Sequence, residues 1–133
     1  MRQHNNNLSK IIPCILVLLF FSCQPASIIG DKISPDKIAD GIFEGRYKYG
    51  FNEAVVEVTI QNQKIIKINL IQHKAWKGRK ADDIIPERII SAQSTHVDAV
   101  SGATNSSRVI MNAVQMAIEK SIAYNKITAE YEQ

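Results

Sequence analysis

The sequence predicts an α+β domain, in which an antiparallel β-meander of three or more strands packs with two helices. Two patterns point to this class. Apolar and polar residues alternate through 43–72, which is typical of half-buried strands joined by short turns. After Thr104, apolar residues recur with helical spacing, which indicates an amphipathic helix that buries one stripe.

Three runs define the strands, at residues 43–51, 54–60 and 65–72. A bend at 50–53 and a turn at 61–64 join them, so consecutive strands are expected to pair antiparallel. The second strand is expected to bury alternate apolar residues, namely Ala54, Val56, Val58 and Ile60. On the third strand we expect Ile66, Ile68 and Leu70 to share one face and Ile65 and Ile71 to lie on the other.

Two helices follow the strands. Asp82 and Asp83 are expected to cap the first, and Pro86 fits its first turn, where a missing N–H costs little. Its apolar stripe consists of Ile85, Ile89 and Ile90. The second helix is expected to run for about five turns, with a longer apolar stripe. The stripe holds Ile110, Ala113, Val114, Ala117, Ile118 and Ile122. The residues that suit its N-cap are Asn105, Ser106 and Ser107.

Length and charge limit the class of protein. The chain has 133 residues, so one domain is expected. Its net charge of +3 falls to +1 without Arg2 and Lys10, which precede the first apolar run. A body so close to neutral offers no clustered basic surface for nucleic acid. The two cysteines are Cys14 and Cys23, so the body beyond them has no thiol for a disulfide, an iron–sulfur cluster or zinc.

Residues 1–22 have the features of a lipoprotein signal peptide. The apolar run at 11–21 is shorter than the roughly 20 residues that a bilayer span needs. Ser22-Cys23 resembles the lipobox of bacterial lipoproteins, which implies lipidation of Cys23, although Phe20 departs from the usual Leu. Such a lipid would anchor the exported protein at the membrane of the bacterial cell envelope, on its periplasmic or surface side. An uncleaved anchor and an ordinary signal peptide are the alternatives.

The rest of the chain divides into three parts. Residues 23–39 are expected to be the lipidated Cys and a tether, 40–124 the folded domain and 125–133 a C-terminal tail. Turn-forming and polar residues predominate in the tether. Isoleucines interrupt it, so part of it is expected to pack on the domain; they are Ile28, Ile29 and Ile33.

The stretch with the clearest chemical signal is Asp98-Ala99-Val100-Ser101-Gly102-Ala103-Thr104. A loop of small residues that opens into a helix leaves free backbone N–H groups, and the helix dipole favours an anion there. The physics therefore predicts a phosphate or carboxylate site near Thr104. A plain turn with an N-cap, using Gly102 for an unusual backbone angle, is the alternative.

This stretch resembles the flavinylation motif of the FMN-binding domain family. The resemblance extends to Asp40–Gly45, which looks like the family's opening, and to Pro86–Thr95, which looks like its middle helix. It implies that FMN is joined through its phosphate to the hydroxyl of Thr104 in a phosphoester bond. It also implies a flavin transferase as partner, which makes that bond from FAD with magnesium.

The resemblance assigns a role to each motif residue. Thr104 supplies the hydroxyl, while Gly102 and Ala103 keep side-chain bulk away from the transferase. Ser101 is expected to donate a hydrogen bond to a phosphate oxygen. Asp98 is expected to be a recognition residue for the transferase and its magnesium, or an Asx-turn cap of the loop.

Three other residues are weaker candidates. Trp76 could stack on the isoalloxazine ring and His73 could lie near it, or Trp76 could cover a sheet edge and His73 cap a strand end. His96 could act as an acid or base close to Asp98, or be a simple loop histidine. No second ligand with a suitable spacing accompanies His73, so no metal site is expected.

The function expected from the residues and the resemblance is electron transfer by a covalently bound flavin, between extracytoplasmic or membrane redox partners. A covalent bond would prevent loss of the cofactor outside the cell membrane. Two alternatives remain open. One is a flavoprotein reductase that acts directly on a small acceptor, and the other is a non-redox surface lipoprotein that keeps the fold without flavin.

Overall fold

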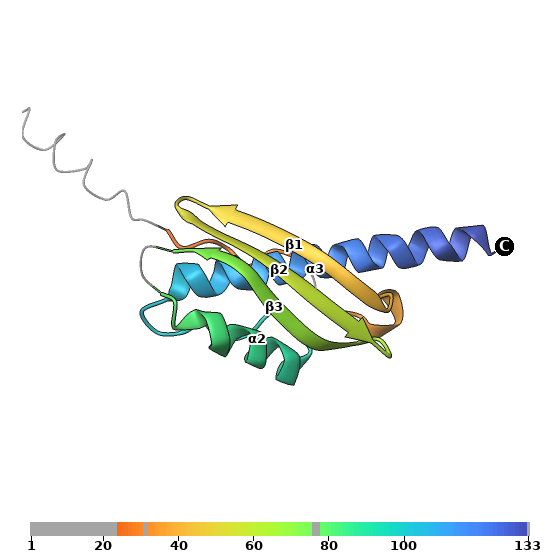
Figure 1. Cartoon of the computed structure of the whole chain (residues 1–133), viewed down its shortest axis with the longest axis horizontal. Coiled ribbons are helices and arrows are strands. Elements are labelled where there is room, and N and C mark those ends of the chain that lie inside the picture. The colour runs from red at the N-terminus through yellow and green to blue at the C-terminus, as the bar shows by residue number, and fades with distance from the viewer. Residues whose placement is uncertain (1–23, 31, 76–77, 133) are drawn as a thin grey trace, which may run out of the picture.

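The computed structural model describes residues 24–30, 32–75 and 78–132. Its elements in chain order are η3 (Pro35–Lys37), β1 (Gly41–Tyr49), β2 (Asn52–Gln61), β3 (Lys64–Lys74), α2 (Ala81–Ala92) and α3 (Thr104–Tyr131). The three strands form one sheet, α3 lies along one face of it, and α2 lies beside β3 (Figure 1). The predicted α+β class, with a meander and two helices, is confirmed. Within the described ranges, no helix is long and apolar enough to cross a membrane.

The sheet has the order β1-β2-β3 and both pairs are antiparallel. The β2–β3 hairpin turns at Asn62 and Gln63, which both adopt positive φ angles, as a tight hairpin turn requires. The carboxylate of Asp40 accepts hydrogen bonds from the backbone N–H groups of both residues, at 2.8 and 2.9 Å, and so fixes this turn. The predicted alternation on β2 is confirmed, because the alternate apolar residues from Ala54 to Ile60 are all at most 2% exposed.

The expected faces of β3 are wrong in part, because two β-bulges interrupt its pairing with β2. Ile65 pairs with Ile60 and Lys67 with Thr59, so Ile66 is an extra residue between them. As a result Ile65 is buried together with Ile68, whereas Ile66 is 49% exposed and does not share the face of Ile68 as expected. A second bulge leaves Ile71 unpaired and 60% exposed.

Helix α3 supplies the largest part of the core. It has 28 residues, so it is longer than predicted and continues through most of the expected C-terminal tail. The predicted stripe is buried at 0% exposure from Ile110 to Ile118, and Ile122 packs against the core. The helix approaches β1 so closely that a Cβ atom on Gly45 would lie 1.9 Å from the carbonyl oxygen of Ala113. A side chain at position 45 is therefore incompatible with this packing.

Helix α2 closes the core beside β3. Ile85 and Ile89 are fully buried and Ile90 is partly buried, as its predicted stripe requires. Its N-cap is Lys80, not an aspartate, and Pro86 lies in the second turn instead of the first. The side chain of Gln93, just after the helix, exchanges two hydrogen bonds with the backbone of Ile65. This pairing ties the end of α2 to the start of β3.

The segment expected as a tether packs on the domain over its described part. Residues 24–29 run along α3 without forming a helix or a strand, and Ala26 is fully buried. Ile28 and Ile33 pack against the core, and Ile38 is part of it. These contacts agree with the expectation that the isoleucines of this segment pack.

Candidate functional site

The motif residues lie in the loop between α2 and α3. Val100 and Ala103 point into the core, whereas Ser101 and Gly102 are exposed. The N–H of Ala103 donates to the carbonyl oxygen of Val100 at 2.9 Å, and Gly102 has a φ of +72°, which few residues other than glycine adopt. The loop therefore turns tightly with its small residues at the surface.

Thr104 is the first residue of α3 and is half-buried. The N-cap is Ala103, which makes no side-chain capping hydrogen bond, so the three expected caps lie inside the helix. Ser107 instead fixes the loop: its Oγ accepts from the N–H of Val100 at 2.9 Å and donates to the carbonyl oxygen of Ala103 at 2.8 Å. The hydroxyl of Thr104 thus lies at the positive end of a helix that lacks a side-chain cap.

A cation that the sequence patterns did not single out lies over this loop. A Cβ atom on Gly102 would be 3.1 Å from the Nζ atom of Lys80, so the ammonium is in contact with the glycine. No ion pair within the described residues involves Lys80. Gly78 brings the Lys80 segment close to the helix, since a Cβ there would be 2.7 Å from Oγ of Ser106. The sequence does show a basic run here, Lys77-Gly78-Arg79-Lys80, but nothing in its spacing predicts that Lys80 lies close to Gly102.

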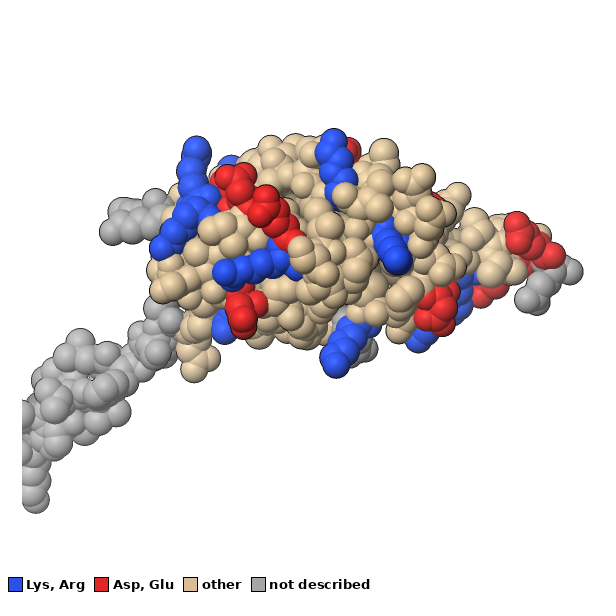
Figure 2. Space-filling model, turned by 90° about the horizontal axis from the view of Figure 1, so that it is seen from below, with Lys and Arg blue, Asp and Glu red and all other residues tan. Residues whose placement is uncertain are grey.

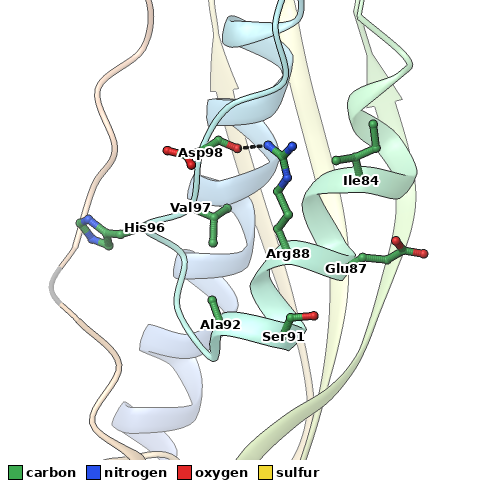
Figure 3. A pocket seen from close by; sticks show the side chains of 8 residues that line it. All are labelled: Ile84, Glu87, Arg88, Ser91, Ala92, His96, Val97 and Asp98. Atoms are coloured by element: carbon green, nitrogen blue, oxygen red, sulfur yellow. Dashed lines mark hydrogen bonds between the residues drawn. The ribbon is translucent and has the colours of Figure 1, made fainter.

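Asp98 is exposed at the edge of a hollow of about 750 Å³ between α2 and residues 96–98. Figure 3 shows Arg88 extending from α2 to the backbone carbonyl oxygen of Asp98, to which its guanidinium donates. His96 points away from α2, and its Nε2 lies 3.2 Å from the carbonyl oxygen of Gly30. The structure therefore places Asp98 and His96 at the hollow's rim, with a backbone contact for each.

His73 is half-buried as a residue, but only 2% of its side chain is exposed. Its Nδ1 lies 2.6 Å from the carboxylate of Asp82, and its buried Nε2 has no hydrogen-bond partner within the described part of the chain. Its position in the last two residues of β3 agrees with a role at a strand end. Trp76 lies outside the described residues. Within those residues, no cluster of three or more His, Cys, Asp or Glu could hold a metal ion.

The geometry fits a phosphate group at Thr104. The helix end has no side-chain cap, the adjoining loop is built of small exposed residues, and a lysine ammonium lies over Gly102. A phosphoester carries one negative charge, which both the helix end and Lys80 would stabilise.

A family model of the FMN-binding domain matches residues 50–119. The chain belongs to the FMN-binding domain family. The resemblance drawn from the motif is thereby confirmed, and the match extends from the β1–β2 turn through the motif loop to the first half of α3. Family membership supports binding of FMN and a flavin-based role in electron transfer.

Two relatives are consistent with this assignment. The chain is 33% identical over 103 residues to the NADH:fumarate oxidoreductase of Klebsiella pneumoniae (strain 342), covering 76% of this chain and 11% of that protein. It is 30% identical over 95 residues to an uncharacterized protein of Treponema pallidum (strain Nichols), covering 67% and 25% respectively. The chain thus spans a quarter or less of the length of these relatives.

Proposed function

We propose that this protein is an exported, lipid-anchored electron carrier that holds one FMN in a phosphoester bond to Thr104. The observation that supports the proposal best is the position of that threonine. Its hydroxyl is the first side-chain oxygen of α3, at a helix end without a side-chain cap and beside a loop of small residues. FMN supplies reversible one- and two-electron chemistry when it is bound.

Attachment would proceed by transfer from FAD, catalysed by a magnesium-dependent flavin transferase. The hydroxyl of Thr104 would lose its proton and its Oγ atom would form a bond to the FMN phosphorus of FAD. The phosphoanhydride bond of FAD would break and AMP would be the leaving group. No oxidant or reductant is needed, because the oxidation state of the flavin does not change.

The chain's own residues have three tasks in this scheme. Gly102 leaves the exposed backbone accessible to the transferase, whereas Ala103 is buried. Ser101 is free at the surface to donate to a phosphate oxygen. The ammonium of Lys80 and the amides of α3 would offset the phosphate's charge. Asp98, exposed at the hollow beside α2, would be the residue that the transferase recognises.

Electron transfer, and not catalysis on a substrate, is the activity we propose for this chain. The Lys74 ammonium lowers the pKa of Glu53, and this carboxylate is paired with Lys74 and Arg46 in an ion-pair cluster on the sheet. The matched part of the Klebsiella oxidoreductase is a small fraction of that protein. By analogy, we propose that this chain holds the flavin while redox partners supply and accept its electrons.

The test is the intact mass of residues 24–133, produced with and without a co-expressed flavin transferase. A gain of one FMN less one water is expected only with the transferase. Thr104→Ala should abolish the gain and Thr104→Ser should retain part of it, since serine keeps the hydroxyl. Thr128→Ala is the matched control, because it removes a threonine hydroxyl near the other end of α3 and should leave the mass gain intact. Absence of any gain with an active transferase would refute the proposal.

A further inference from the structure

The first described residues are bound to the start of α3, one residue from the proposed flavin attachment point. The N–H of Ala26 donates to Oδ1 of Asn105 at 3.3 Å, and Arg108 donates to the carbonyl oxygen of Ala26 at 2.8 Å. Ala26 itself is fully buried. The backbone here is therefore fixed on both of its hydrogen-bonding groups.

Asn112 extends this attachment by one more turn of the helix. Its Oδ1 accepts from the N–H of Ile29 at 3.0 Å, and its Nδ2 donates to the carbonyl oxygen of Ser27 at 2.8 Å. The hydroxyl of Tyr49 donates to the carbonyl oxygen of Gln24 at 2.9 Å. We call residues 24–29 the strap, since five hydrogen bonds hold them along α3 and β1.

The strap determines where a lipid on Cys23 would lie. Two residues separate Cys23 from Ala26, so the covalent chain limits the reach of a lipid anchor on Cys23 to about 11 Å from a backbone that is bonded to Asn105. Thr104 is the next residue of α3. The anchor and the flavin would therefore be at the same end of the domain, while the C-terminus lies at the opposite end (Figure 1).

The same end carries an exposed aromatic residue. Phe51 is 92% exposed in the turn between β1 and β2, two residues from the Tyr49 that contacts the strap. A phenyl ring this exposed in a turn offers apolar surface to the boundary of a bilayer.

Cations surround this aromatic residue and the motif loop. Lys48, Arg79 and Lys80 form no ion pair within the described residues. Of the nearby acids, Glu53 pairs with Lys74 and Arg46, and Asp82 pairs with His73. Asp83 and the exposed Asp98 are the acids of this end that form no ion pair within the described chain. On the face that Figure 2 shows, acidic and basic side chains are mixed. The excess of unpaired cations at this end suits the anionic headgroups of a membrane.

We infer that this end of the domain is a membrane-facing surface, which holds the flavin at the level of the lipid headgroups. The inference rests on the proposed function and on anchoring at Cys23. It is more specific than either, since a flexible tether of the same length would let the domain turn in any direction. The strap removes that freedom.

The experiment uses two reporters at opposite ends of the molecule. The chain from Cys23 onward, which holds every described residue and has no other cysteine, is coupled through that thiol to a maleimide phospholipid in anionic vesicles. Phe51→Trp and Tyr131→Trp place a tryptophan at an exposed aromatic position at each end; Tyr131 is 87% exposed. Quenching by lipids with a nitroxide on the headgroup is measured against the parent chain.

We expect strong quenching of the Phe51→Trp reporter and almost none of the Tyr131→Trp reporter. Insertion of twelve Gly and Ser residues between Cys23 and Gln24 should abolish most of this difference without touching the folded domain. Equal quenching at both ends, or no effect of the insertion, would overturn the inference. The quenching measurement needs neither FMN nor natural lipidation. A failure of the flavinylation test would therefore refute the proposed function but not the orientation of the domain at the membrane.

Discussion

Helix α3 packs so closely on β1 at Gly45 that Gly45→Ala is predicted to reduce the stability of the fold severely. The added Cβ would lie 1.9 Å from the carbonyl oxygen of Ala113 and 2.6 Å from the nitrogen of Ala117. Both are backbone atoms of α3, so no rotamer change relieves the clash, and the helix must move away by more than about 1 Å to restore ordinary contact distances. Such overpacking costs about 3 kcal/mol, at the upper end of the usual range. That loss is a large share of the roughly 5–15 kcal/mol that stabilises a typical domain.

Urea unfolding followed by circular dichroism measures this loss directly. Gly50→Ala is the matched control, because no heavy atom lies within 4 Å of its added Cβ and only the positive φ of +57° is unfavourable. We expect it to cost about 1 kcal/mol, the usual strain of a non-glycine residue in the left-handed region. If Gly45→Ala lost no more than Gly50→Ala, with an unchanged m-value, the close packing of α3 on β1 would be refuted.

Three further predictions concern the loop, the strap and the charged cluster on the sheet. Gly102→Ala should lower the free energy of unfolding by about 1 kcal/mol, because an alanine is strained at a φ of +72°. It should also slow FMN transfer, which intact mass would show as a lower flavinylated fraction after the same reaction time. Normal stability and normal transfer would contradict the loop geometry. Asn112→Ala should lower the free energy of unfolding in urea by about 2 kcal/mol, because it removes two hydrogen bonds to the strap. It should also speed hydrogen exchange at the Ile29 amide, and an unchanged exchange rate would show that Asn112 does not hold the strap. The Lys74 ammonium lowers the pKa of Glu53 from its ordinary 4.5, so this carboxylate stabilises the fold above that pH and the contribution is lost as pH falls through the lowered value. Glu53→Gln should therefore reduce the difference between the thermal midpoints measured at pH 7 and at acid pH. If this difference were the same in the variant and the parent protein, Glu53 would not contribute to the pH dependence of stability as predicted.

The parts of the fold that the sequence predicted are those in which one pattern continues without interruption. The alternation from Ala54 to Ile60 continues through β2 because this central strand pairs on both sides. The helical stripe from Ile110 to Ile118 is likewise regular, so periodicity alone located the core. The motif loop was located as well, because small residues before a helical pattern are a local signal.

The parts that sequence did not predict depend on contacts between distant segments. Two bulges change which residues of β3 share a face. They are defined by pairing with β2, which no local pattern reports. Lys80 approaches Gly102 only because α2 and α3 begin at the same end of the molecule. The strap's hydrogen bonds to Asn105 and Asn112 join residues that are 79 and 83 positions apart in the sequence. The composition of the segment therefore predicted a tether but not the path that it takes along α3.

The start of α3 links the local chemistry to these distant contacts. Capping preferences favour Asn105, Ser106 or Ser107, yet the helix begins at Thr104 after an alanine N-cap. Two of these three expected N-caps have other partners instead. Asn105 accepts a hydrogen bond from the strap, and Ser107 links Val100 to Ala103. The residues best suited to cap the helix are thus used to hold its surroundings. Within the described residues no hydrogen bond to the Thr104 hydroxyl is found, so this hydroxyl and the first N–H groups of α3 would be available to the proposed phosphate. An N-cap variant, Ala103→Asp, should therefore stabilise the protein by about 1 kcal/mol in urea unfolding while lowering flavinylation, because its carboxylate would occupy the place of the phosphate. A stabilised variant that still accepts FMN at the normal rate would contradict this account of the site.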